Sequence, residues 1–189
     1  MRNPTLTSKR YTMKHSLLFI CLGNICRSPA AEGVMRQMAE RRRLGDSIVV
    51  DSAGIGAWHV GEQPDHRMCS HARRRGYDLT TLRARQFSSR DFLWFDYIVV
   101  MDEENYRDVM RQKPAISHTP HSTQAAPHSA PDTEVHLAEV LRMKDFFIEH
   151  KGQPTVPDPY YGGAEGFELA LDLIEDGCQG LLDYLCKGK

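Results

Sequence analysis

The chain has 189 residues and carries 24 lysines and arginines against 25 aspartates and glutamates, which gives a formal net charge of −1. This length suits one α/β domain. The near-neutral charge excludes a general attraction to nucleic acid or to an anionic membrane surface. The five cysteines are an odd number without regular spacing, which excludes a disulfide-stapled secreted scaffold. We therefore expect a reducing compartment, the cytoplasm.

Residues 1–14 are predicted to form a disordered tail. Basic residues in this tail precede the apolar run Leu17–Leu22, as they would in a signal peptide. The run is short, Asn24 and Arg27 follow it closely, and no small-residue cleavage pattern is present. We expect Met13 to be an alternative start, and no apolar stretch is long enough to span a membrane.

The segment from Cys21 to Pro29 joins an apolar strand at 17–20 to an amphipathic helix at 29–43. Ser28 is expected to cap this helix and Pro29 to be its first residue. The first N–H groups of a helix lack internal partners and lie at the positive end of the helix dipole, which favours phosphate. The predicted phosphate-binding residues are Leu22, Gly23, Asn24, Ile25, Cys26, Arg27 and Ser28.

Two side chains of this segment indicate an active site. Cys21 ends the strand, and a thiol beside a helix N-terminus and an arginine is expected to be a thiolate at neutral pH. The planar fork of Arg27 can hold two phosphate oxygens while charge moves in the transition state. A nucleophile in an anion-binding loop predicts attack on the phosphorus of a bound ester, which requires no metal and no cofactor.

The elements that follow alternate between strands and helices. Buried strands are expected at 48–50 and 97–101, and helices at 64–75, 102–110 and 164–186. This order predicts parallel strands joined by right-handed crossovers.

Residues 112–135 break the alternation, because they are rich in proline, histidine, serine and alanine and poor in apolar anchors. Their histidines lack the fixed spacing and the partner cysteines of a metal site, so a disordered insertion is favoured over metal binding. The insertion would interrupt a single domain at 15–189. The apolar periodicity of 137–150 predicts a partly helical segment.

A second motif lies at Asp158, between Pro157 and Pro159 and before Tyr160 and Tyr161. The prolines stiffen the loop, which therefore presents the carboxylate in a defined position. Displacement of an oxygen from phosphorus requires a proton donor for the leaving group, and Asp158 is the candidate.

The string CLGNICRSP and the distant DPYY motif resemble those of the low-molecular-weight protein tyrosine phosphatase family, especially its bacterial branch. The resemblance implies a three-layer α/β/α fold, with a central four-stranded parallel sheet and the phosphate loop between strand 1 and helix 1. It also implies hydrolysis of phosphotyrosine and small aryl phosphates through a phosphocysteine on Cys21. Arg27 would bind the phosphate, and Asp158 would act as general acid and then as general base.

The same resemblance assigns supporting roles and names one departure. Ser52 would brace Asn24, and the aromatic residues of the substrate slot would be Trp58, Tyr160 and Tyr161. The departure is Leu82, which occupies the position where the family has a histidine in the network that supports the phosphate loop.

Three questions stay open at this point. One alternative is an arsenate reductase of the same fold, although 77–110 contain no cysteine for electron relay. Another is a phosphate-ligand sensor with weak catalysis, which Leu82 would favour. Cys26 is either a partner of Cys21 in a reversible disulfide or a small buried filler. The expected partners are phosphotyrosine-containing proteins, by analogy a bacterial tyrosine kinase, with no nucleic acid and no membrane.

Overall fold

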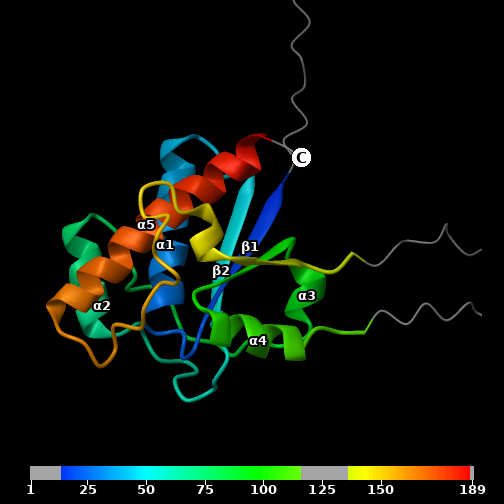
Figure 1. Ribbon diagram of the computed structural model, residues 1–189, viewed down its shortest axis with the longest axis horizontal. Coiled ribbons are helices and arrows are strands. Elements are labelled where there is room, and N and C mark those ends of the chain that lie inside the picture. Colours follow the sequence, from blue (N-terminus) through cyan, green and yellow to red (C-terminus); the bar gives the residue numbers. More distant parts are fainter. Residues whose placement is uncertain (1–13, 116–135, 188–189) are drawn as a thin grey trace, which may run out of the picture.

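A computed structural model describes residues 14–115 and 136–187 (Figure 1). Its four strands form one parallel sheet in the order β2-β1-β3-β4. The strands are β1 His15–Cys21, β2 Ile48–Gly54, β3 Tyr97–Val100 and β4 Glu139–Arg142.

Helices cover both faces of this sheet (Figure 1). The helices are α1 Arg27–Arg41, α2 His66–Arg74, α3 Asp91–Trp94, α4 Glu103–Arg111 and α5 Ala164–Lys187. On β1, Leu17 and Phe19 join the core that includes residues of α1, α2 and α5, whereas Leu18 and Ile20 join the core with residues of α3 and α4. Successive side chains of a strand point to opposite faces, which explains the division. The predicted three-layer fold is confirmed.

The predicted start of the first helix is wrong by two residues. Helix α1 begins at Arg27, after Cys26, and Ser28 lies inside its first turn instead of capping it. The Ser28 hydroxyl is directed at the phosphate loop, where its neighbours are Cys21 and Asn24.

The helical interpretation of 137–150 is wrong for its first part. This segment supplies the edge strand β4, followed by a single 3₁₀ turn at Met143–Phe146. The strand has only four residues and pairs with β3 on one side, Tyr97 opposite Glu139. A short edge strand carries too little alternation to be recognised without its partner.

Two predictions concern segments that lie mostly or partly outside the described residues. Of the predicted tail at 1–14, the structure describes only Lys14, and of the predicted insertion at 112–135 it describes 112–115.

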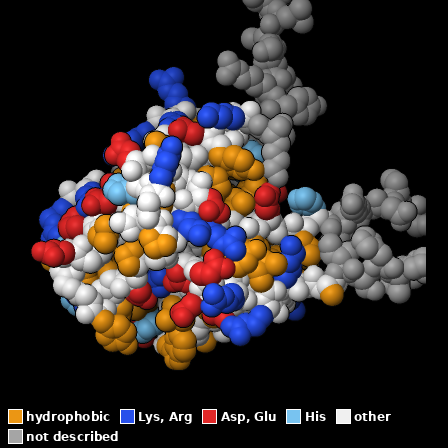
Figure 2. Space-filling view, in the orientation of Figure 1, with side chains coloured by type: hydrophobic (Ala, Val, Ile, Leu, Met, Phe, Trp, Pro, Cys, Tyr) orange, Lys and Arg blue, Asp and Glu red, His pale blue; other side chains and the backbone are white. Residues whose placement is uncertain are grey.

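Within the described ranges, no helix combines the length and the apolar character that crossing a bilayer requires. Acidic and basic side chains are interspersed over the face shown in Figure 2.

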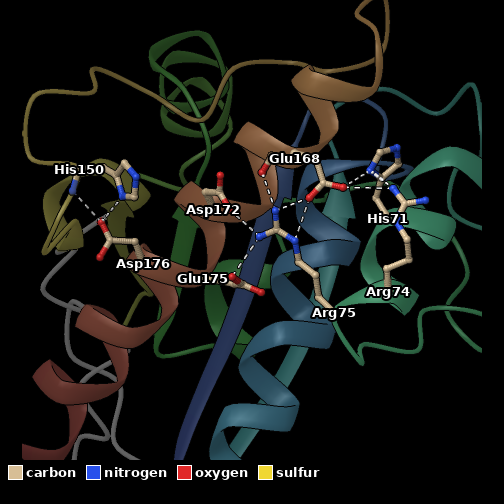
Figure 3. A network of polar contacts seen from close by, with 8 residues as sticks. All are labelled: His71, Arg74, Arg75, His150, Glu168, Asp172, Glu175 and Asp176. Carbon is tan, nitrogen blue, oxygen red and sulfur yellow. Dashed lines mark hydrogen bonds and ion pairs between the residues drawn. The ribbon is translucent and has the colours of Figure 1, made fainter.

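A network of charged side chains joins α2 to α5 (Figure 3). Arg75 pairs with Glu168, with Asp172 at 2.7 Å and with Glu175 at 3.1 Å. Glu168 also accepts hydrogen bonds from His71 and Arg74. The hydrogen bonds from Arg75 and His71 lower the pKa of Glu168 to about 2.

This lowered pKa predicts a pH dependence of stability. A carboxyl whose folded pKa lies below its unfolded value, about 4.3, stabilises the fold above that value and loses this contribution as the pH falls towards 2. We expect Glu168→Gln to lower the free energy of unfolding at pH 7, with a difference from the wild type that shrinks between pH 5 and 2. Urea unfolding at a series of pH values measures it, with the exposed Glu149→Gln as control. A difference that is constant with pH would contradict the assignment.

Candidate active site

One pocket, of about 330 Å³, opens at the carboxyl edge of the sheet. Three segments line it: the loop between β1 and α1, the loop after β2, and the loop before α5. Its lining residues are Cys21, Leu22, Gly23, Ile25, Cys26, Arg27, Trp58, His59, Asp158, Tyr160 and Tyr161. The carboxyl edge is where open parallel sheets bind ligands. The structure therefore brings Cys21, Arg27 and Asp158 into one pocket, although Asp158 is far away in the sequence.

Asn24 holds the phosphate loop in shape. Its φ is 56°, in the left-handed region that non-glycine residues rarely adopt. Its side-chain nitrogen donates to Ser28 and Ser52, each at 2.9 Å, and its oxygen accepts from the Arg85 N–H at 2.9 Å. These three hydrogen bonds satisfy a buried amide and stabilise the strained backbone. The contact between Ser52 and Asn24 is therefore present, with Arg85 as an additional partner.

The end of β2 lies directly behind the phosphate loop. A Cβ on Gly54 would lie 2.9 Å from the Asn24 nitrogen, so only glycine fits at this position. Just beyond it, the N–H of Ile55 donates to the Cys21 carbonyl at 3.0 Å, and that of Gly56 to the Leu22 carbonyl at 2.9 Å. These two hydrogen bonds join the start of the phosphate loop to the segment after β2.

The Cys21 thiol ends β1 and is buried. Its sulfur lies 3.0 Å from the Ser28 hydroxyl oxygen. Because Ser28 accepts a hydrogen bond from Asn24, its own proton is available to the sulfur or to the Ala53 carbonyl, 3.3 Å away. The Ser28 hydroxyl is therefore placed to donate a hydrogen bond to the sulfur.

Arg27 is buried and anchored on three sides. It donates to Asp102 at 2.6 Å, to the Val156 carbonyl at 3.1 Å and to Asp158 at 2.9 Å. Burial by itself would lower the pKa of Arg27, but the interactions with Cys21, Asp158 and Asp102 outweigh it and raise the pKa. The guanidinium is therefore a fixed cation at the closed end of the pocket.

Asp102 is a site residue that the sequence analysis did not single out. It follows β3 and caps α4, where one carboxylate oxygen accepts from the Asn105 N–H at 2.7 Å and the other binds Arg27. A signal was available, because Asp102 directly follows a predicted strand, at the edge of the sheet where Cys21 ends β1.

Asp158 is partly exposed and faces the pocket, with 40% of its side chain accessible. One oxygen binds Arg27, and the other accepts from the Tyr160 N–H at 3.1 Å. The loop thus fixes the carboxylate from both sides and leaves it open to a bound molecule.

The buried carboxyl of Glu32 supports Ser52, which in turn contacts Asn24. Glu32 accepts a hydrogen bond from Ser52 at 2.6 Å and pairs with Arg36 at 2.5 Å. Burial raises the pKa of Glu32, while the bond from Ser52 and the charge of Arg36 act in the opposite direction. The sequence analysis missed Glu32, since a single acid on a helix gives no signal of burial.

Leu82 leaves the support of the phosphate loop intact. Its side chain is partly buried and packs against the hydrophobic core. Both polar atoms of the Asn24 amide are satisfied by Ser28, Ser52 and Arg85. The network around Asn24 is thus complete without a polar side chain at position 82.

The aromatic residues predicted for the slot lie at the mouth of the pocket. Trp58, Tyr160 and Tyr161 all line it, and they are 69%, 37% and 97% exposed. Trp58 lies over Gly56, where an added Cβ would be 1.9 Å from the indole ring. The mouth therefore presents flat apolar walls around a charged floor.

Cys26 shares the pocket with Cys21, and both thiols are free. Burial raises the pKa of Cys26, with a further contribution from Asp65. Cys26 is therefore a neutral thiol in the resting protein.

Among the described residues, no group of three or more His, Cys, Asp or Glu side chains could hold a metal ion.

Comparison with known proteins adds a family to this geometry. The profile described as "Low molecular weight phosphotyrosine protein phosphatase" matches residues 16–189. The low molecular weight protein-tyrosine-phosphatase YfkJ of Bacillus subtilis is 38% identical over 174 residues, which cover 92% of this chain and 97% of that protein.

Solved structures of phosphatases are also similar to this chain over most of its length. A protein tyrosine phosphatase of Entamoeba histolytica, with Hepes in its active site, superposes with a TM-score of 0.78 at 38% identity and covers 93% of this chain and 99% of its own. The Drosophila arginine phosphatase DARP superposes with a TM-score of 0.73 at 31% identity, over 89% of this chain and 96% of its own.

The support from Asn24 predicts a large effect of its removal. We expect Asn24→Ala to destabilise the fold by about 3 kcal/mol, because buried partners lose their hydrogen bonds and alanine at positive φ adds strain. Asn24→Gly removes the strain but not the loss of hydrogen bonds, and should cost about 1 kcal/mol less. Urea unfolding measures both, with the exposed Gln63→Ala as control. Equal stability of the two variants would contradict the role of the backbone conformation.

Proposed function

Because this chain belongs to the low molecular weight phosphotyrosine protein phosphatase family, we propose that it hydrolyses protein phosphotyrosine through a phosphocysteine on Cys21. The observation that carries the proposal is the meeting of Cys21, Arg27 and Asp158 in one pocket. A thiolate nucleophile, a fixed cation and a carboxyl group are the three groups that displacement at phosphorus requires.

In the first step, the phosphate of the substrate binds the loop amides and Arg27. The phosphate oxygens take over guanidinium N–H groups such as the one that Asp158 accepts here. The Cys21 sulfur attacks phosphorus in line, so an S–P bond forms while the P–O bond to the tyrosine oxygen breaks. Asp158 gives its proton to that oxygen, and the phenol leaves as a neutral group.

In the second step, water replaces the phenol. Asp158, now a carboxylate, takes a proton from the water as its oxygen bonds to phosphorus and the S–P bond breaks. Cys21 leaves as a thiolate, which the Ser28 hydroxyl stabilises from 3.0 Å. Arg27 and the loop amides hold the equatorial oxygens in both steps.

The aromatic mouth supports an aryl phosphate as the substrate class. Trp58 and Tyr160 line a pocket whose floor is Cys21, so a flat ring between them brings its phosphate to the sulfur. The shorter side chain of phosphoserine would leave its phosphate away from the sulfur. We propose phosphotyrosine-containing proteins as partners, by analogy a bacterial tyrosine kinase, and the reducing cytoplasm as the compartment.

Arsenate reduction is the weaker candidate. It needs further thiols that relay electrons from Cys21, and of the five cysteines only Cys26 shares its pocket. Cys178 is buried in α5, and Cys186 lies near the end of the same helix. Nothing in the described residues places a second relay thiol beside the loop.

The mechanism predicts how two substitutions act on turnover. Cys21→Ser should abolish hydrolysis of p-nitrophenyl phosphate in the presence of EDTA, since a serine hydroxyl is a far weaker nucleophile than a thiolate. Asp158→Asn should lower kcat/KM about 100-fold for phenyl phosphate, and less for p-nitrophenyl phosphate, whose leaving group needs less protonation; kcat/KM is compared because it reports the step in which the leaving group departs. Matched controls are Cys186→Ser and Asp46→Asn, both exposed. An Asp158→Asn loss independent of the leaving group would argue against a proton donor.

The burial of Cys21 within the pocket predicts the selectivity of the pocket. We expect kcat/KM for a phosphotyrosine peptide to exceed that for the matched phosphoserine peptide by about 100-fold or more, since the shorter ester does not reach Cys21. Phosphoarginine, the class that the name of the Drosophila neighbour suggests, belongs in the same assay. Comparable turnover of phosphoserine, or faster turnover of phosphoarginine, would overturn the assignment.

A further inference from the structure

One charged residue outside the catalytic group contacts a wall of the substrate slot. Arg67 is the second residue of α2, and its guanidinium carbon lies 5.3 Å from the ring centroid of Tyr160. It also lies 4.9 Å from the ring centroid of Phe167 on α5. Arg67 thus contacts a ring that lines the pocket and a ring that belongs to the core.

The guanidinium is held in a fixed orientation by Asp65. One carboxylate oxygen accepts from the Arg67 Nη2 at 2.7 Å, and the other accepts from Nε at 3.1 Å and from the main-chain N–H at 2.8 Å. Burial would raise the pKa of Asp65, but these bonds from Arg67 lower it. A bidentate pair with a third bond to the same carboxylate leaves the plane of the guanidinium little freedom.

Asp65 is in turn tied to the phosphate loop. Its N–H donates to the Ile25 carbonyl at 2.8 Å, and Ile25 lines the pocket. The chain of contacts therefore runs from the phosphate loop through Asp65 to Arg67, and from Arg67 to the ring of Tyr160.

The base of this stack is also fixed. Phe167 is buried and stacks on His71, with ring centroids 5.3 Å apart and an interplanar angle of 16°. His71 binds Glu168 in the network between α2 and α5 (Figure 3). The ring of Tyr160 also contacts the ring of Tyr161, which is 97% exposed and therefore gives it little support.

We propose that Arg67 is a positioning residue that fixes the Tyr160 wall against the phosphate loop and thereby sets the affinity of the slot for an aryl group. This inference rests on the proposed function, because it names what selects the aryl part of the substrate. Arg67 touches neither the phosphate nor Cys21, so its effect falls on the ring of the ligand. A cation over an aromatic face holds the ring by electrostatic attraction.

The test compares two ligands in the Arg67→Met variant. Inorganic phosphate reports on the loop alone, and phenylphosphonate reports on the loop together with the slot. Since both ligands are anions, the ratio of their dissociation constants largely cancels the loss of the positive charge. Isothermal titration should show the preference for phenylphosphonate falling about 5-fold. Arg67→Lys keeps a cation but loses the bidentate pair, so its ratio of dissociation constants should lie between those of the wild type and Arg67→Met. The control is Arg73→Met, an exposed position on the same helix, whose ratio should match that of the wild type.

A double-mutant cycle with Tyr160→Leu separates positioning from a structural effect. If Arg67 acts through Tyr160, then Arg67→Met has no further effect on the ratio in the Tyr160→Leu background. In steady-state assays with an aryl phosphate, the single variant should raise KM about 5-fold and leave kcat nearly unchanged.

An unchanged ratio in Arg67→Met, or the same change with and without Tyr160, would overturn the inference. Urea unfolding of each variant identifies any that fails to fold, and Arg67→Lys then carries the comparison. The binding ratio needs no turnover. If the wild-type protein binds both anions but does not hydrolyse aryl phosphates, the proposed function alone is overturned. The ratio of the two dissociation constants then still tests the positioning role of Arg67.

Discussion

The rest of the site depends on the left-handed backbone of Asn24. A loop between a strand and a helix can direct its N–H groups at one phosphate only if the chain turns sharply within a few residues. Here the turn is made at a non-glycine residue with φ of 56°. Three hydrogen bonds hold it, and Gly54 leaves the space behind it. The partners of Asn24 lie in α1, in β2 and in the loop at Arg85, so the loop keeps its shape only in the folded sheet.

Arg27 extends this arrangement from the loop to the rest of the sheet edge. Its contacts reach Asp102 after β3, and Val156 and Asp158 in the loop before α5. One guanidinium therefore positions the phosphate loop, the cap of α4 and the candidate acid together. Leu82 does not weaken this arrangement, because its side chain packs into the core and the polar groups around Asn24 have other partners. The hydrogen bonds of the Asn24 amide are thus complete with leucine at position 82.

The sequence predicted the features that are local and missed those that depend on distant partners. The phosphate loop and Asp158 were identified because each carries its chemistry within a few consecutive residues. Asp102 and Glu32 escaped notice, since their roles come from Arg27 and Ser52, which meet them only in the fold. The edge strand β4 was missed for a related reason, because four residues beside a single neighbour carry no clear period.

Two groups of residues support the site, and each acts on a different part of a bound ester. Asn24, Ser52 and Arg85 act on the phosphate loop, which any phosphate ester would occupy. Asp65 and Arg67 act on Tyr160, which only the organic part of an ester would meet. Because the Asp65 N–H joins the Ile25 carbonyl, the second group is built onto the first. Under the proposed function, this connection would hold an aryl group at a fixed distance from Cys21.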